Sequence, residues 1–466
     1  MVVFGGKQIV KPGAYSIVDA EGMFPVSVGG QKILAIIGKA DRGQPKTVLW
    51  FNNPVSAKNI FKSGELLKAA QIAWSPSTSL PGADLIAMIR VNPATKASHQ
   101  LSDAQSKPAI ELESKDWGVI PLKVTVSISE STNRVVTITD GETTEVTPPF
   151  NENSDIVSWI NENSLLVNAS LITGDNPDLI ASVVETDFTI AGTNPDPNAE
   201  DWEYCVDLLR TEEVNGIIPV TSDATIHAYV KSHCNEMSDI LVKKERRMFV
   251  GHALNENIAD IKTKAFNLGS HRALLASPGI KRAFSGVVET LSSVYTAAAL
   301  AGMWAGVDSA YPLTFDYVDA LGLEKIYEDA EIKDLAQNGV TVIELVPRRG
   351  YRVVRAITTH ISSENILYQE LSVSTLADVM SQNIRDHLEM LFIGKPKRPD
   401  TIPSMQTALE SMLNQFVRLN WLVGDENNPP YRNISIFQEG TAFFVNWEGS
   451  ISVPVNYVLI TSSFTL

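Results

Sequence analysis

Residue types that could catalyse a reaction or bind a ligand occur at few places in this 466-residue chain. Gly38-Lys39-Ala40-Asp41-Arg42-Gly43 follows a short apolar run, as a phosphate-binding loop would. It lacks both the Gly-Lys-Ser/Thr of a P-loop and the Gly-x-Gly-x-x-Gly of a dinucleotide fold. The loop therefore favours a structural turn, and an α/β enzyme with a phosphate-binding loop at 38–43 remains an alternative interpretation.

The histidines and cysteines form no recognisable catalytic or metal-binding pattern. The seven histidines lack HExxH spacing, and no Gly-x-Ser-x-Gly nucleophile elbow is present. His227, His233 and Cys234 could face a metal, although helix-surface or core positions are favoured. Cys205 and Cys234 cannot make a disulfide framework and are better explained as small buried hydrophobes. We expect no catalytic site, cofactor or metal, and hence no enzyme.

Charge is distributed unevenly along the chain. Thirty-eight basic and fifty-four acidic residues give a net charge of −16, which argues against a general nucleic-acid binder. Residues 97–200 alone carry −13, and the rest of the chain carries only −3. Such an acidic segment is expected to face solvent as an outer module. The main basic clusters, Arg348-Arg349-Gly350 and Lys395-Pro396-Lys397-Arg398-Pro399, are either solvated loops or docking patches for an acidic protein.

Alternating apolar strands and helical segments predict an α/β core over residues 23–96 plus 201–362, with a mainly parallel sheet covered on both faces. The membrane-like stretch Val287–Gly306 contains Glu289 and is expected to be a buried helix, so we expect no membrane insertion. The expected strands are Lys32–Lys39, Asp84–Val91, Gly216–Val220, Arg247–Ala253, His271–Ser277, Gly339–Val346 and Val353–Thr359, and the expected helices are Ser56–Trp74, Thr225–Val242, Ile258–Leu268, Gly286–Gly306 and Glu328–Gln337.

The acidic segment 97–200 has a different pattern. Lys123–Glu130 alternates apolar and polar residues, which indicates a half-solvated antiparallel strand with Arg134–Thr139 as its partner. Ser154–Glu162 suits a short helix. We expect residues 97–200 to be an inserted, β-rich α+β outer module.

The end of the chain predicts a separate α+β unit over residues 363–450. Apolar residues recur at helical spacing from Leu376 to Leu391 and from Leu409 to Leu419, and a hairpin is expected between Asn433 and Trp447. Residues 1–22 and 451–466 predict extended, strand-like arms. Because neither arm has an evident local partner, each is expected to pair with a sheet edge elsewhere, with pairing inside its own subunit as the alternative.

Several strings, taken in order, resemble the tail sheath proteins of contractile phages and related injection machines. Lys11-Pro12-Gly13-Ala14-Tyr15 is similar to the family's Pro-Gly-x-Tyr opening, and Ile36–Gly43 to its strand followed by Gly-x-Ala-x-x-Gly. The later matches are His271–Gly279, the small-residue helix Ala297–Gly302, Asn338–Ile343, Val353–Thr359 and Ile393-Gly394-Lys395-Pro396.

The resemblance implies a structural subunit that polymerises as stacked hexameric rings around an inner tail tube. In such proteins the arms are donated to sheets of neighbouring subunits, and the C-terminal domain faces the tube. The resemblance assigns inter-subunit contacts to Pro12, Gly13, Tyr15, Val453, Val455, Tyr457 and Leu459, and tube contacts to Lys395, Lys397 and Arg398.

The implied mechanism is contraction of a metastable sheath, without nucleotide hydrolysis, that drives the tube through the host envelope. The implied partners are further copies of the chain, the tube protein, the baseplate and the tail-terminator or neck proteins, with no direct nucleic acid. The implied location is the virion tail, assembled in the bacterial host cytoplasm. The sheath of a bacteriocin or secretion-type injection machine remains an alternative.

Overall fold

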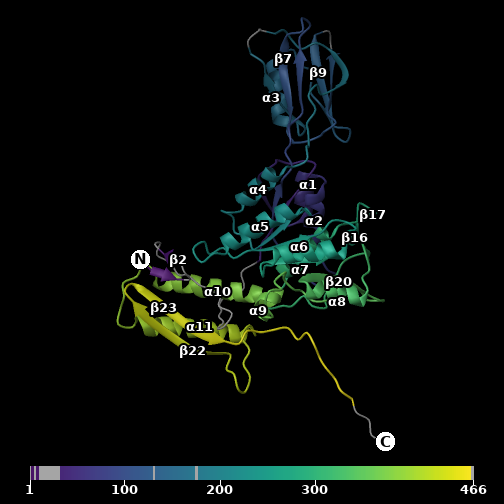
Figure 1. The fold of residues 1–466 in the computed structure, drawn as a ribbon. Coiled ribbons are helices and arrows are strands. Elements are labelled where there is room, and N and C mark those ends of the chain that lie inside the picture. The colour runs from purple at the N-terminus through teal and green to yellow at the C-terminus, as the bar shows by residue number, and fades with distance from the viewer. Residues whose placement is uncertain (1, 5–6, 10–31, 130–131, 174–176, 463–466) are drawn as a thin grey trace.

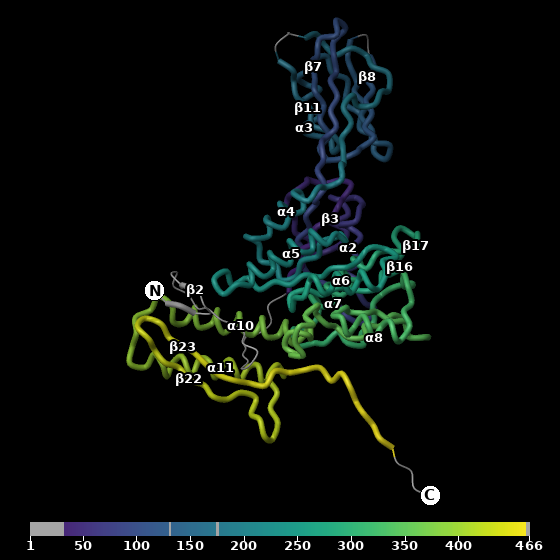
Figure 2. Tube along the Cα trace, in the orientation of Figure 1, coloured from purple at the N-terminus to yellow at the C-terminus, as the bar shows by residue number. Residues whose placement is uncertain are grey.

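The computed structural model describes residues 2–4, 7–9, 32–129, 132–173 and 177–462. A central α/β part carries a β-rich module at one end and two long helices with a hairpin at the other (Figure 1). The chain then continues as an extended segment that leaves the body of the molecule (Figure 2). The predicted contact residues Pro12, Gly13 and Tyr15 lie outside the described residues.

A nine-stranded sheet forms the middle of the molecule, in the order β18-β21-β20-β15-β14-β13-β3-β5-β4. The run from β20 to β5 is parallel, as the alternation of strands and helices predicted. Antiparallel strands close both edges. The parallel strands are β3 (Leu34–Gly38), β5 (Ile86–Arg90), β13 (Gly216–Pro219), β14 (Arg247–Gly251), β15 (Ala273–Ser277) and β20 (Val340–Val346), and the edge strands are β4 (Val48–Phe51), β18 (Tyr317–Val318) and β21 (Gly350–Val353).

Helices cover both faces of this sheet, which is why its strands are apolar at successive positions. Leu34 and Ile36 of β3 enter one core, and Ala35 and Ile37 enter the other. One face is covered by α1 (Pro54–Phe61), α2 (Glu65–Trp74) and α7 (Ser293–Gly306), and the other by α4 (Ala199–Leu208), α5 (Ala224–Met237), α6 (Ile258–Leu268) and α8 (Asp329–Gln337).

Helix α7 packs closely on α2 through its small residues. A Cβ built on Gly302 would stand 2.3 Å from the carbonyl oxygen of Ala73, so only glycine fits there. The helix is buried along most of its length. Among the described residues, no helix is both long and apolar enough to span a bilayer.

Three expected elements of this part were wrong. The expected helix Ser56–Trp74 is two helices, because Gly64 between them has a φ of +113°. The helix expected from Gly286 starts at Ser293, and the preceding residues form β17 (Val287–Thr290) beside β16 (Ile280–Phe284), which also pairs with β19 (Gly322–Leu323).

The strand expected at Val353–Thr359 is the third error. The chain instead turns back after β20 and pairs antiparallel as β21, with Val346 opposite Gly350. The turn of three residues is too short for the crossover that a parallel strand needs. The residues after Val353 run as irregular chain, in which Thr341 Oγ1 donates to the Ile357 carbonyl at 2.8 Å.

In its described residues, the projecting module holds two antiparallel sheets and one helix around its own apolar core. Lys123 and Thr139 are paired in register, as the alternating pattern predicted. The orders are β10-β9-β8-β12 and β11-β7-β6, built from β6 (Ser98–Ser102), β7 (Pro108–Ser114), β8 (Lys123–Ser129), β9 (Asn133–Thr139), β10 (Thr144–Val146), β11 (Val167–Leu171) and β12 (Val183–Asp187), with α3 at Asn153–Asn163.

The C-terminal part packs two helices on a hairpin. Leu409, Leu413 and Phe416 contact Leu376 and Trp421 in one cluster. The elements are α9 (Ile366–Gln369), α10 (Leu371–Phe392), α11 (Thr401–Arg418), β22 (Tyr431–Glu439) and β23 (Ala442–Gly449). At the other end of the chain, β1 (Val2–Phe4) pairs with β2 (Lys7–Ile9), so the first residues do have a local partner, contrary to expectation.

Candidate functional site

The C-terminal segment after β23 is the candidate site that the sequence singled out. Ile451 makes a single bridge to Leu422, and Ser452 N donates to the Trp421 carbonyl at 2.9 Å. From Ser452 to Ser462 the chain forms no strand ladder. The expected strand conformation is therefore not realised in the single subunit, because an extended chain needs a partner for its backbone hydrogen bonds.

The apolar side chains of this segment project into solvent. Val453, Val455, Tyr457 and Leu459 are all exposed, Leu459 to 94%. Val458 and Ile460 are exposed as well, to 75% and 83%, and were missed by the alternating pattern. The signal for them was present, since 457–460 is apolar at every position. A run of this kind in water indicates a surface that a partner covers.

The C-terminal part also contains a sheet with open edges. β22 and β23 form a two-stranded sheet, and within the described residues neither outer edge is paired. Phe437 and Phe444 stack across the hairpin with ring centroids 5.0 Å apart, and Phe437 is 42% exposed. Unpaired edges of this length are templates for another strand.

The three basic residues assigned to a tube contact lie together in the exposed loop between α10 and α11. Lys395 Nζ donates to the Met390 carbonyl at 3.3 Å, and Lys397 Nζ donates to Gln438 Oε1 on β22. The Arg398 backbone N–H donates to Thr401 Oγ1 at 2.8 Å. The loop thus carries three exposed cationic residues, and Lys397 connects it to β22 beside the β22–β23 turn.

The loop at 38–43 uses its amides within the chain. Ala40 N donates to Asn92 Oδ1 at 2.9 Å, and Gly43 N donates to Asp116 Oδ1 at 3.0 Å. The Asp41 amide donates to the Ser63 carbonyl at 3.2 Å. A phosphate loop would present these N–H groups to its ligand. Because these N–H groups already have partners within the chain, the structure favours a structural turn over a phosphate-binding loop.

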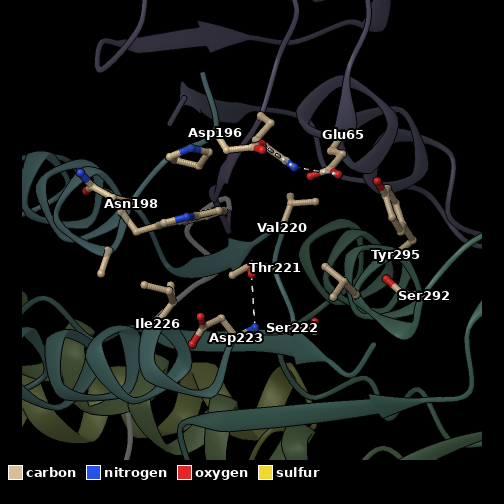
Figure 3. A pocket seen from close by; sticks show the side chains of 15 residues that line it. Glu65, Asp196, Asn198, Val220, Thr221, Ser222, Asp223, Ile226, Ser292 and Tyr295 are labelled. Carbon is tan, nitrogen blue, oxygen red and sulfur yellow. Dashed lines mark hydrogen bonds and ion pairs between the residues drawn. The ribbon is translucent and has the colours of Figure 1, made fainter. Parts of the chain in front are cut away.

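A cavity of about 450 Å³ opens beside this loop, at the carboxyl ends of β3 and β13. Ligands often bind at that position in open α/β sheets. Here Lys39 Nζ lies 3.5 Å from Glu65 Oε1 and 3.4 Å from Asp196 Oδ1 (Figure 3). Asp223 caps α5 by accepting from Thr225 N at 2.7 Å. Carboxylates of the chain itself therefore already pair with the Lys39 ammonium and cap the N-terminus of α5, which are the positive groups that would attract a phosphate.

The histidines considered as metal ligands are held in structural contacts. His227 Nε2 lies 2.8 Å from the Thr221 carbonyl, and His233 Nε2 lies 2.8 Å from Arg246 Nη1. Burial lowers the pKa of each to about 4, so both are neutral at pH 7. Cys234 is buried, and burial raises the pKa of its thiol to about 12. No group of three potential ligands occurs in the part of the chain that the structure describes.

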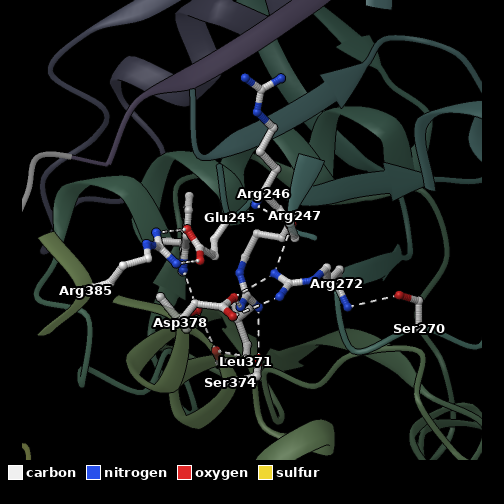
Figure 4. A network of polar contacts seen from close by, with 12 residues as sticks. Glu245, Arg246, Arg247, Ser270, Arg272, Leu371, Ser374, Asp378 and Arg385 are labelled. Atoms are coloured by element: carbon white, nitrogen blue, oxygen red, sulfur yellow. Dashed lines mark hydrogen bonds and ion pairs between the residues drawn. The ribbon is translucent and has the colours of Figure 1, made fainter. Parts of the chain in front are cut away.

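A buried ionic network joins the C-terminal part to the central sheet. Asp378 on α10 binds Arg247 and Arg272, and Arg385 binds Glu245 with Nη1 2.6 Å from Oε1 (Figure 4). Although burial opposes it, the two guanidinium groups hold the pKa of the Asp378 carboxyl below its usual value. Sequence patterns gave no sign of this network, because its members come from distant segments.

Known proteins match this chain along nearly its whole length. Residues 196–359 match the family model described as the phage tail sheath protein central domain. The chain is 27% identical to a tail sheath protein of Bacillus phage SP01, over 99% of this chain and 97% of that one. It is 21% identical to the tail sheath protein of Staphylococcus phage Twort, over 94% of each.

Solved structures share the fold. The sheath tail protein from Desulfitobacterium hafniense has a TM-score of 0.68 at 13% identity, over 91% of this chain and 97% of that one. The contracted helical sheath of the anti-feeding prophage has a TM-score of 0.55 at 12% identity, over 98% and 99%. The resemblance to contractile phage tail sheath proteins that the sequence motifs predicted is therefore confirmed, with the family's central domain matched at residues 196–359.

Proposed function

We propose that this protein is the structural subunit of a contractile tail sheath. It polymerises as stacked hexameric rings around an inner tail tube, and contraction of the polymer drives the tube through the host envelope. The observation that carries the proposal is the C-terminal segment 453–460, which leaves the subunit without a strand partner of its own and exposes the apolar side chains of Val453, Val455 and Tyr457–Ile460. Similarity to a phage tail sheath protein over 99% of the chain supports it.

The segment acts as an arm that adds a strand to a sheet of a neighbouring copy. Backbone hydrogen bonds supply affinity in such strand addition, and alternate side chains set the register. The open edges of β22 and β23 are suitable acceptors, because they belong to a two-stranded sheet that would gain a further strand. Pro12, Gly13 and Tyr15 are proposed to serve the same linkage at the other end of the chain.

The C-terminal part faces the tube through the α10–α11 loop. Lys395, Lys397 and Arg398 are exposed there and would meet acidic groups of the tube protein. An attraction between exposed charges is screened by salt and releases easily, which suits a surface that must separate during contraction. The acidic module 97–200 projects from the opposite end of the central part and would face outward (Figure 1).

Contraction requires no nucleotide in this proposal. The extended sheath is assembled in a metastable state and changes to a shorter, wider lattice with more favourable contacts. Two packings of one sequence that differ by a few kcal/mol per subunit are physically reasonable, and the contributions of many subunits add up. The baseplate triggers the change, the neck or terminator proteins close the polymer, and neither nucleic acid nor a membrane is contacted directly.

The setting is a virion tail assembled in the cytoplasm of a bacterial host. The sheath relatives of Bacillus and Staphylococcus phages favour this setting. The second candidate is a sheath of a bacteriocin or secretion-type injection machine, which the fold shared with the anti-feeding prophage sheath supports. The two candidates differ in their biological setting and share the same mechanism of sheath contraction.

Negative-stain electron microscopy of the purified protein at rising concentration, with and without the tube protein, tests the polymer directly. Long hollow cylinders with a helical surface are expected. Uniform small particles under both conditions would overturn the proposal.

A further inference from the structure

The C-terminal segment changes its environment at Asn456. From Ser452 to Asn456 the residues alternate, with Ser452, Pro454 and Asn456 partly covered and Val453 and Val455 exposed. From Tyr457 to Ser462 every residue is exposed. The first part therefore lies with one face on its own subunit, and the second part has no contact face there.

One side-chain contact marks the boundary. Asn456 Nδ2 donates to Glu370 Oε1 at 2.8 Å, across 86 positions of sequence. Glu370 is 1% exposed, so its carboxylate lies inside the subunit. Asn456 is thus the last residue of the described segment that contacts a buried, charged acceptor.

Glu370 also joins the two main parts of the subunit. Arg355 Nε and Nη2 both lie 2.6 Å from the same Oε1, and Arg355 follows β21 of the central sheet. The Glu370 backbone forms an isolated antiparallel β-bridge with Ile357, and Glu370 is also the N-cap residue of α10. The central sheet, the C-terminal helices and the exposed segment therefore meet at one carboxylate oxygen.

We infer that Glu370 and Asn456 form a clasp that fixes where the C-terminal arm leaves its subunit, so that only residues from Tyr457 onward are exchanged with a second copy of the chain. Residues 452–456 stay on their own subunit in this arrangement, so the inference keeps Tyr457 and Leu459 in the exchanged strand and removes Val453 and Val455 from it. The inference rests on the proposed function for the exchange, and the clasp itself is a property of the single subunit.

The hydrogen bond between Asn456 and Glu370 can set the direction in which the arm leaves the subunit. A hydrogen bond to a charged acceptor is stronger than one between neutral groups. Asn456 Oδ1 is buried and has no hydrogen-bond partner among the described residues, and an unpaired buried oxygen offsets part of that stabilisation. The clasp therefore orients the arm without fixing it rigidly to the subunit.

Limited elastase digestion of the monomer, followed by mass spectrometry, tests the clasp. Wild-type protein is expected to be cut after Val458 and Ile460 well before it is cut after Val455. Asn456→Asp places a carboxylate against Glu370, and like charges at this distance repel. We expect cleavage after Val455 to become about tenfold faster in this variant, because proteolysis follows local opening.

Two further variants keep the test decisive. Asn456→Ala removes the donor without adding charge and is expected to accelerate the same cleavage. Thr461→Asp adds the same charge beyond the clasp and should leave cleavage after Val455 as slow as in wild type. Synthetic peptides of residues 450–462 carrying each substitution correct for the sequence preference of the protease. Wild-type rates in both Asn456 variants, or an equal acceleration in Thr461→Asp, would refute the clasp.

The polymer is assayed separately by electron microscopy of the wild-type protein. If the cleavage pattern is as expected but no cylinders form, the clasp stands and the proposed function fails. If wild-type cylinders form while Asn456→Asp is cut like wild type, only the clasp fails.

Discussion

Asp378 Oδ2 on α10 lies 2.7 Å from Arg247 Nη2 at the start of β14, and the pair is almost completely buried. Arg272 adds a second guanidinium, with Nη1 2.8 Å from the same oxygen and Nη2 3.0 Å from Oδ1. A carboxylate with two fixed cationic partners ties the long C-terminal helix to the central sheet. The two parts are therefore expected to unfold and move together.

Replacing Asp378 with Asn should cost about 3–5 kcal/mol of unfolding free energy, because two buried guanidinium groups lose their counter-charge. Chemical denaturation followed by tryptophan fluorescence measures this loss. Asp386→Asn on the same helix is the matched control, since the Asp386 side chain is 62% exposed and lies 3.8 Å from Arg385. Equal stability of Asp378→Asn and wild type would contradict the role of the pair.

The same carboxylate should make the fold sensitive to acid. The pKa of Asp378 is lowered below its ordinary value of 3.8, so its stabilisation is present above that value and is lost as pH falls through the folded-state pKa. The difference in unfolding free energy between wild type and Asp378→Asn should therefore shrink below about pH 4. A difference that stays constant down to about pH 2 would speak against it.

Lys32 should make the protein more stable as pH rises above neutrality. Its ammonium is buried 5.0 Å from the Trp304 ring and has no hydrogen-bond partner among the described residues. Burial lowers the pKa of Lys32 from 10.5 to about 7, against the opposing charge of Asp308 and together with that of Arg247. The unfolded chain binds the extra proton between these values, so stability increases with pH across that window.

Lys32→Met removes this proton linkage. The variant should be more stable than wild type at about pH 7, by up to a few kcal/mol. The gain should shrink as pH rises towards about 10. Denaturation curves at several pH values across this window provide the measurement, with the exposed Lys58→Met as control. If Lys32→Met and Lys58→Met showed the same pH profile, the linkage would be disproved.

Removing residues 457–466 should leave a folded monomer that no longer assembles. The described part of this segment is exposed throughout, so its loss exposes no core. Circular dichroism and the denaturation midpoint should match wild type, while cylinders disappear in electron micrographs. Leu459→Asp should act in the same direction, because a charge does not fit a covered apolar face. Regular cylinders from the truncated chain would eliminate the arm as a link.

The module 97–200 should be dispensable for assembly. Residues 97–191 can be removed by joining Lys96 to Gly192, since Thr95 and Thr193 are already bridged in an antiparallel pair. The deletion removes Asp116, which accepts from Gly43 N, so a loss of about 1 kcal/mol is expected. Calorimetry and electron microscopy of the shortened chain supply the data. Failure to fold would place the module in the core of the subunit.

Charge reversal in the α10–α11 loop should weaken binding to the tube without affecting the subunit. The triple variant Lys395→Glu, Lys397→Glu, Arg398→Glu is expected to lose about tenfold or more in affinity for purified tube protein. The wild-type affinity should fall with added salt. Arg348→Glu with Arg349→Glu is the matched control, because these arginines are also exposed but lie at the β20–β21 turn. Equal losses in both variants would exclude a specific tube contact at the loop.

Local patterns predicted the strands and helices whose residues carry the information themselves. The continuously apolar run Ile33–Ile37 predicted the strand that the structure has at Leu34–Gly38, buried on both faces. The alternation from Lys123 became a half-solvated strand in register with its neighbour. In the C-terminal arm the alternation singled out Val453, Val455, Tyr457 and Leu459, which are exposed, but it missed the equally exposed Val458 and Ile460. Val353–Thr359 shows the limit, because an apolar run cannot reveal that a three-residue turn has reversed the chain.

The contacts that give the subunit its tertiary geometry depend on residues far apart in the chain. Asn456 meets Glu370 across 86 positions, and Arg247 meets Asp378 across 131. The sequence near these residues does not indicate their partners, since a polar side chain in a helix or an extended segment is ordinarily solvated. Composition and periodicity determined which segments form strands, helices and arms, because those depend on neighbouring residues. Only the tertiary structure brought the distant charges together, because a buried carboxylate is stable only beside the cation or donor that the whole chain places there.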